Sequence, residues 1–191
     1  MNRSTLLLVA AMVSLANVAS GQTAGGGAAA AKAEVRTIEA PDIAALRLAA
    51  ARNEAWAQFD LGVALACGRG VTRNRAEAAA WFSRAAEQGH TEAQSVLGWI
   101  YMTGSGVRRD DKQALRWLSS AAERGSTTAQ NNLGIVYAQG RGVPVNRAEA
   151  EKWFRKAAAQ GAADGARNLD ILLKGNGGAV RPSAQPPVYP G

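Results

Sequence analysis

A repeat of 36 residues restricts the fold of this chain more than any other feature of its sequence. Two kinds of marker keep this spacing without an insertion, a Leu-Gly pair and a Trp. They are Leu61-Gly62, Leu97-Gly98 and Leu133-Gly134, followed by Trp81, Trp117 and Trp153. Periods of about 20 to 50 residues are typical of repeat proteins, in which each unit buries its apolar face only against its neighbours. We therefore expect a stack of similar units and not a sandwich or barrel, in keeping with an aromatic content of only 6%.

The pattern within one unit predicts two helices. In the first helix, Ala93, Leu97 and Tyr101 lie four residues apart and so share one face. This helix should end at Gly104, because glycine readily takes the left-handed conformation that follows a helix end. The second helix begins with a capping residue followed three positions later by Glu or Gln, which resembles a capping box. These pairs are Asn74 and Glu77, Asp110 and Gln113, and Asn146 and Glu149.

A glycine stands inside the first helix of every unit, although glycine in a helix interior costs about 1 kcal/mol relative to alanine. Its repetition predicts that a neighbouring backbone approaches too closely to leave room for a Cβ atom. The repeated apolar and glycine positions together form the predicted structural core. They are Leu61, Gly62, Trp81, Leu97, Gly98, Tyr101, Trp117, Leu133, Gly134, Tyr137 and Trp153.

The repeat also organises the chain into domains. We predict an all-α fold, a right-handed α-solenoid of helix–turn–helix repeats with a capping helix at either end, since solenoids need atypical ends to cover their exposed core. The three full repeats cover residues 57–92, 93–128 and 129–164, the caps cover 42–56 and 165–174, and the solenoid covers 42–174.

The two ends of the chain lack this pattern. Residues 1–21 are predicted to be a secretory signal peptide, with an apolar run from 6 to 16 and small residues at the cleavage site. A membrane anchor is the alternative, but the run is shorter than the about 20 residues that span a bilayer. A Gly/Ala-rich linker is predicted at 22–41, and a disordered Pro/Gly-rich tail at 175–191. We therefore expect export to the periplasm or the medium.

The repeats resemble the Sel-one-like (Sel1-like) repeat family, a relative of the tetratricopeptide repeats. The family pattern is A-x-x-x-L-G-x-x-Y, then G-x-G-V, an acidic or Asn residue, A-x-x-W and A-A-x-x-G. The second unit carries it as Ala93, Leu97-Gly98, Tyr101, Gly104, Gly106-Val107, Asp110, Ala114, Trp117, Ala121-Ala122 and Gly125. The first unit departs from it at Leu65, where Tyr is usual. The resemblance implies a scaffold that binds other proteins, often in bacterial envelope, secretion or signalling contexts.

The chain has one His and one Cys, which excludes a two-His metal site, an internal disulfide framework and a Cys zinc site. We predict no metal, no cofactor and no enzymatic activity. His90 lies in a loop between repeats, where a role as a catalytic base is the alternative. Cys67 either remains a thiol or pairs with a second chain in an oxidising compartment.

The predicted partner site is a groove on the concave face, which the first helices of the units line in a solenoid. The 100° step between helix residues turns these side chains away from the core: Phe59, Val63, Ser95, Trp99, Met102, Asn131 and Ile135. Their apolar members favour a binding surface, and a slight helix rotation that buries them is the alternative. Trp99 is not one of the repeated Trp residues, so we predict that its truncation weakens binding and spares the fold. Gln94 and Gln130 either bond a bound peptide or are solvated.

The net charge of +7 reflects basic residues at the turns within the units. They are Arg69, Arg73, Arg75, Arg108, Arg109, Arg141 and Arg147. Such a rim attracts an acidic partner or anionic lipid, or is simply solvated. Because the chain is predicted to be exported, we do not expect it to bind nucleic acid. We predict a protein–protein interaction scaffold that binds a peptide or protein in its groove. The alternatives are a cell-envelope hydrolase and an envelope protein that binds polysaccharide or anionic lipid.

Overall fold

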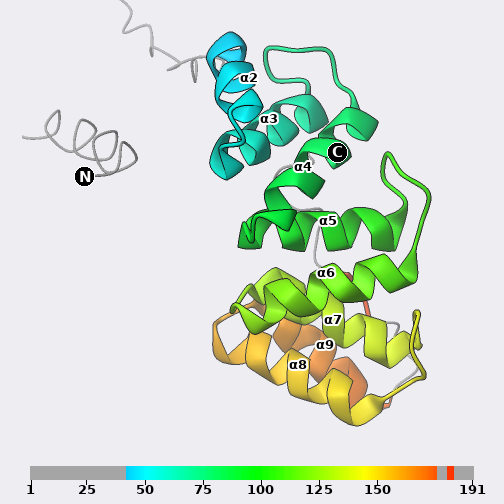
Figure 1. Cartoon of the computed structure of the whole chain (residues 1–191). Coiled ribbons are helices and arrows are strands. Elements are labelled where there is room, and N and C mark those ends of the chain that lie inside the picture. Colours follow the sequence, from blue (N-terminus) through cyan, green and yellow to red (C-terminus); the bar gives the residue numbers. More distant parts are fainter. Residues whose placement is uncertain (1–41, 176–179, 183–191) are drawn as a thin grey trace, which may run out of the picture. The chain divides into compact units, whose positions relative to one another are not determined.

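The computed structural model describes residues 42–175 and 180–182, which form eight helices and no strand (Figure 1). The helices are α2 (Ile43–Ala51), α3 (Ala55–Cys67), α4 (Arg75–Glu87), α5 (Thr91–Thr103), α6 (Asp111–Glu123), α7 (Thr127–Gln139), α8 (Arg147–Ala159) and α9 (Ala163–Lys174). Each helix packs against the next one along the chain, so the predicted α-solenoid is confirmed. The predicted signal peptide and linker, at 1–21 and 22–41, lie outside the described residues.

The even-numbered helices of the repeats begin at the predicted capping residues. The Asn74 side chain accepts a hydrogen bond from the Glu77 backbone N–H at 3.1 Å, and Asp110 and Asn146 cap α6 and α8 in the same way. The backbone N–H of Asn74, which Glu would satisfy in a capping box, donates to the Leu65 carbonyl at 2.8 Å. This bond, repeated in the other two units, ties the start of each even-numbered helix to the preceding helix.

The glycines within the odd-numbered helices chiefly face side chains. The prediction of a close neighbouring backbone was wrong for Gly62 and Gly134, whereas at Gly98 the Leu118 backbone nitrogen would lie 3.1 Å from an added Cβ atom. A Cβ atom added to Gly62, Gly98 or Gly134 would first meet the partner helix's Phe82, Leu118 or Phe154, at 2.7, 2.6 and 2.5 Å. These three partners are fully buried and occupy the same position in their repeats. The absence of a side chain at each glycine therefore leaves room for the largest fully buried side chain of the even-numbered helix.

Closer backbone approach occurs at the turns. A Cβ atom on Gly106 would lie 2.6 Å from the Arg75 backbone, and one on Gly142 would lie 2.9 Å from the Asp111 backbone. Both glycines also have a positive φ, of 83° and 71°, which disfavours other residues. The turns of the second and third units thus rest directly on the start of the even-numbered helix in the preceding unit.

The two sets of helices form layers of different character. Nine of the thirteen residues of α5 are buried, but only five of the thirteen in α6. The odd-numbered helices also contact one another, α5 with α7 and α7 with α9, so they form the inner layer of the stack. The even-numbered helices have a solvated face and form the outer layer.

The predicted core residues divide between the interior and its edge. Leu97 and Leu133 are 1% exposed, while Trp81, Tyr101 and Tyr137 are half-buried. The repeated Trp rings are buried at 117 and 153 and half-buried at 81, and a basic side chain lies over each of them. Arg84 lies 4.5 Å from the Trp81 ring centre, Arg116 lies 4.7 Å from that of Trp117, and Lys156 lies 4.2 Å from that of Trp153.

A glutamine at one position of each repeat links it to the preceding unit. Gln58, Gln94 and Gln130 are buried, and each donates a hydrogen bond to a carbonyl near the end of the preceding even-numbered helix. For Gln94 the acceptor is Ala86, at 3.1 Å. Gln94 and Gln130 are therefore part of the joint between repeats, neither solvated nor open to a peptide.

Candidate functional site

The structure corrects the predicted exposure of the groove residues. Five of the seven are buried and two are half-buried. The buried ones are Ser95, Trp99, Met102, Asn131 and Ile135, and the half-buried ones are Phe59 and Val63. The reason is the inner layer itself, because α5 and α7 each pack between two even-numbered helices and against each other. A helix wheel that assumes one free face overstates the exposure of such a helix.

Trp99 in particular belongs to the core. It is 6% exposed, about as little as the repeated Trp117 at 7%, and it shares the main buried cluster with Ile100 and Met102. Burial therefore does not separate Trp99, which was predicted to bind a partner, from Trp117, which was predicted to be structural.

Asn131 and Ile135 lie near residues 180–182 of the predicted disordered tail, Asn131 through its bond with Asn168 and Ile135 through the cluster on which Val180 packs. This short segment, red in Figure 1, takes a defined place against α7 and α9. Val180 packs against the apolar cluster that contains Ile135 and Phe154, to which Leu169 and Leu172 of α9 also contribute. The inner surface of α7 is thus covered by the chain's own C-terminal region.

Asn168 of α9 pairs with the backbone of this segment in both directions. Its Nδ2 donates to the Arg181 carbonyl at 2.7 Å, and its Oδ1 accepts from the Arg181 N–H at 3.0 Å. The second hydrogen of Nδ2 is donated to Oδ1 of Asn131 at 2.8 Å. Gln139 adds a bond to the Val180 carbonyl at 3.3 Å. The fully buried Asn168 amide is therefore oriented by Asn131 and presents one donor and one acceptor to a peptide backbone.

Sequence reasoning identified Asn131 but missed Asn168. The visible signal was a polar residue beside Leu169, which occupies the position of the repeated Leu, in a helix otherwise treated only as a cap. The arrangement can recognise an extended segment by its main chain, with an apolar side chain placed on the Ile135 cluster.

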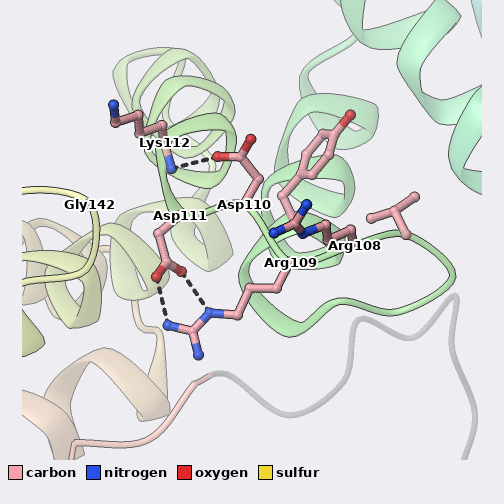
Figure 2. A pocket seen from close by; sticks show the side chains of 8 residues that line it. Arg108, Arg109, Asp110, Asp111, Lys112 and Gly142 are labelled. Atoms are coloured by element: carbon pink, nitrogen blue, oxygen red, sulfur yellow. Dashed lines mark hydrogen bonds and ion pairs between the residues drawn. The ribbon is translucent and has the colours of Figure 1, made fainter.

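The basic turns hold a second surface feature, an open hollow of about 680 Å³ between the turns of the second and third units (Figure 2). Its wall includes Arg108, Arg109 and Lys112 together with Asp110 and Asp111. Figure 2 shows Arg109 forking onto the Asp111 carboxylate, with contacts of 3.1 and 2.6 Å. The basic charge at this hollow is thus partly neutralised within the protein.

Asp111 holds two arginines of the predicted basic rim. Besides Arg109, it accepts a bond from Arg141 at 3.0 Å, and Arg141 also donates to the Met102 carbonyl. The hydrogen bond from Arg109 lowers the pKa of the Asp111 carboxyl, burial opposes this effect, and the charge of Arg141 adds to it. Arg147 in turn donates to the Leu172 carbonyl. Arg141 therefore joins the turns of the second and third units, and Arg147 joins α8 to α9. Arg109 bonds within its own turn and is exposed, as are Arg69, Arg73 and Arg108.

His90 caps a helix. Its Nδ1 accepts a hydrogen bond from the Ala93 N–H at 3.3 Å at the start of α5, and its ring stacks on Phe59 with 4.7 Å between ring centres. Cys67 is half-buried at the end of α3, and burial raises the pKa of its thiol. Within residues 42–175 and 180–182, no group of three or more His, Cys, Asp or Glu side chains is arranged to hold a metal ion.

Comparison with known proteins defines the class of this repeat. The Sel1 repeat matches residues 57–90, 91–126 and 127–161, more than half of the chain. The chain therefore belongs to the Sel1 repeat family, whose members are generally scaffolds for protein–protein interaction. No curated protein sequence matches it significantly.

Two solved structures show the same architecture. A protective antigen of uropathogenic Escherichia coli strains with an SLR fold is 43% identical, with a TM-score of 0.65 over 70% of this chain and 29% of that one. A Sel1 repeat protein from Oxalobacter formigenes is 31% identical, with a TM-score of 0.67 over 74% of this chain and 56% of that one. The chain thus spans less than two thirds of either relative. None of its described helices has the length and apolar character needed to cross a membrane.

Proposed function

We propose that this chain is an exported interaction scaffold, periplasmic or secreted, that binds an extended peptide segment of a partner protein on its inner layer at α7 and α9. The observation that carries the proposal is the two-way pairing of Asn168 with the Arg181 backbone, at 2.7 and 3.0 Å. Main-chain pairing accepts many sequences, and the apolar cluster around Ile135 supplies the preference for a side chain.

The chemistry of Asn168 supports recognition of a backbone in an extended state. A neutral hydrogen bond contributes only about 0.5–1.5 kcal/mol net, so such a site holds its ligand through several bonds together with apolar contact. Asn131 keeps the amide in the orientation that offers both a donor and an acceptor. If the Asn168 amide were turned by 180°, its Oδ1 would face the Arg181 carbonyl oxygen and Oδ1 of Asn131, neither of which can donate a hydrogen bond.

A selection experiment tests the binding function. A random peptide library displayed on phage is panned against the full chain, and the enriched peptides are measured by fluorescence anisotropy. We expect Asn168→Ala to weaken their binding at least about tenfold, because it removes both backbone bonds. Asp170→Ala is the matched control, since this exposed carboxylate on the same helix pairs only with Lys174 among the described residues. Peptides that bind Asn168→Ala as well as the unchanged chain would contradict the proposed site.

Export has its own test. The apolar run and the small residues that follow it within 1–21 support cleavage by a signal peptidase. Intact-mass measurement of the protein from its host should give a chain that begins near residue 22. A full-length chain recovered from the cytosol would contradict export but would not bear on the proposed binding site.

A further inference from the structure

We propose that the segment Val180–Pro182 is a displaceable occupant of this site, so that the chain competes with its own partner for the inner surface of α7 and α9. The inference rests on the proposed function and adds its regulation. In the structure the segment already makes the contacts that a partner peptide needs: both hydrogen bonds with Asn168, one with Gln139, and apolar packing of Val180.

The contacts are of a kind that another chain can reproduce. All three hydrogen bonds use backbone atoms of the segment, the carbonyls of Val180 and Arg181 and the Arg181 N–H. Only one side chain, that of Val180, packs on the apolar cluster, whereas Arg181 and Pro182 are exposed. An external segment with an apolar residue followed by a residue with a backbone N–H can therefore make the same contacts.

The site survives the departure of the segment. The third hydrogen bond of Asn168, to Oδ1 of Asn131 within the folded repeats, does not involve residues 180–182. It keeps the Asn168 amide in position when the segment leaves. The glutamine joints between the repeats lie elsewhere. Phe154, although part of the cluster on which Val180 packs, is also held against Gly134 by a contact that does not involve residues 180–182. Displacement therefore exposes a prepared site and leaves the solenoid folded.

The connection makes the segment an effective competitor. Helix α9 ends at Lys174 and is capped by Gly175, which has a φ of 63°, and only four residues separate Gly175 from Val180. A short linker holds a tethered ligand at a local concentration of the order of millimolar. The apparent affinity for a partner falls in proportion to the fraction of chains whose site is open. A partner therefore displaces the segment only if it binds more tightly or is present at a higher concentration.

The experiment uses the full chain and a labelled synthetic peptide with the sequence of residues 178–184. Val180→Asp places a charge on the apolar cluster and should release the segment while leaving Asn168 intact. We expect this variant to bind the peptide at least about tenfold more tightly than the unchanged chain does. Adding Asn168→Ala to it should abolish the gain. A peptide with an N-methylated arginine, which lacks the donor N–H, should bind Val180→Asp at least about tenfold more weakly.

Arg181→Pro provides a second release variant if Val180→Asp perturbs the fold in a thermal melt. It removes the N–H donated to Asn168 and introduces no charge. Equal peptide affinity in the unchanged chain and in the folded release variants would overturn self-occupancy. Self-occupancy would also be overturned if light scattering detected a dimer whose dissociation releases the segment. The occupant of each site would then come from a second copy of the chain.

The two proposals fail in different ways. If selected partner peptides depend on Asn168 but bind Val180→Asp and the unchanged chain equally, the scaffold function stands and the competing segment is refuted. If no peptide depends on Asn168 in either chain, the binding site itself is refuted.

Discussion

The second and third repeats place equivalent inner-layer residues in different surroundings. Trp99 of α5 lies within the main buried cluster, whereas Ile135 of α7, its equivalent 36 residues later, lies in the cluster against which Val180 packs. Both are nearly inaccessible, at 6% and 0% exposed. The comparison teaches that burial differs in composition here: packing between helices alone surrounds Trp99, whereas a short segment from later in the chain adds to the helix packing around Ile135. Only the second kind can become a binding surface.

The largest expected effect is the loss of Trp99. Truncation of a buried Trp typically destabilises a protein by about 3–5 kcal/mol, and in a domain of this size about 1 kcal/mol lowers the Tm by several degrees. We expect Trp99→Ala to lower the Tm by about 10 °C or more, measured by circular dichroism. Val180→Asp should shift it far less. A Trp99→Ala melt that overlays that of the unchanged chain would place Trp99 back on an exposed face.

A smaller effect is expected where the two repeats are built alike. Gly98→Ala and Gly134→Ala each bring a Cβ atom to within 2.6 and 2.5 Å of a buried side chain, Leu118 or Phe154. Overpacking of this kind costs about 1–3 kcal/mol, so urea denaturation should show similar losses of stability for the two variants. A loss at one position only would mean that the packing within the repeats also differs.

The smallest effect concerns the tie between the turns of the second and third repeats. Because Arg109 lowers the pKa of Asp111, the folded state favours the charged carboxylate. The resulting stability is present above the ordinary Asp pKa of 3.8 and is lost as the pH falls through the lower pKa of the folded state. Asp111→Asn should therefore lower the Tm slightly at pH 7 and have little effect near pH 2. A difference that persists at pH 2 would assign the loss to packing.

Much of the fold could be predicted from the sequence because its signals are local. The caps at Asn74, Asp110 and Asn146 and the terminating glycines lie within a few residues of the helix ends that they define. Their spacing repeats three times, so each unit supports the interpretation of the others. The order of helices followed directly from this regularity.

The site could not be predicted in the same way, because it depends on contacts between distant residues. The exposure of Trp99 was inferred from one helix in isolation, whereas the stack surrounds α5 on several sides. The role of Asn168 depends on a segment thirteen positions later that returns to α9, and no periodicity marks this return. Asn131 was predicted to be exposed in the groove, but it is buried and pairs with Asn168, a contact that the sequence did not indicate.

The central claim is that residues 180–182 occupy the inner surface of α7 and α9 and can leave it. Hydrogen exchange at the Arg181 amide, followed by NMR in the full chain, tests this most directly, since that amide donates to Asn168. We expect the Arg181 amide to be protected from exchange much less than the Trp99 amide, yet more than an amide of an unstructured peptide. This protection should be lost in Asn168→Ala or when a partner peptide saturates the site. Exchange at the unstructured rate would show that the segment does not occupy the site, and exchange as slow as that of Trp99 would show that it cannot leave.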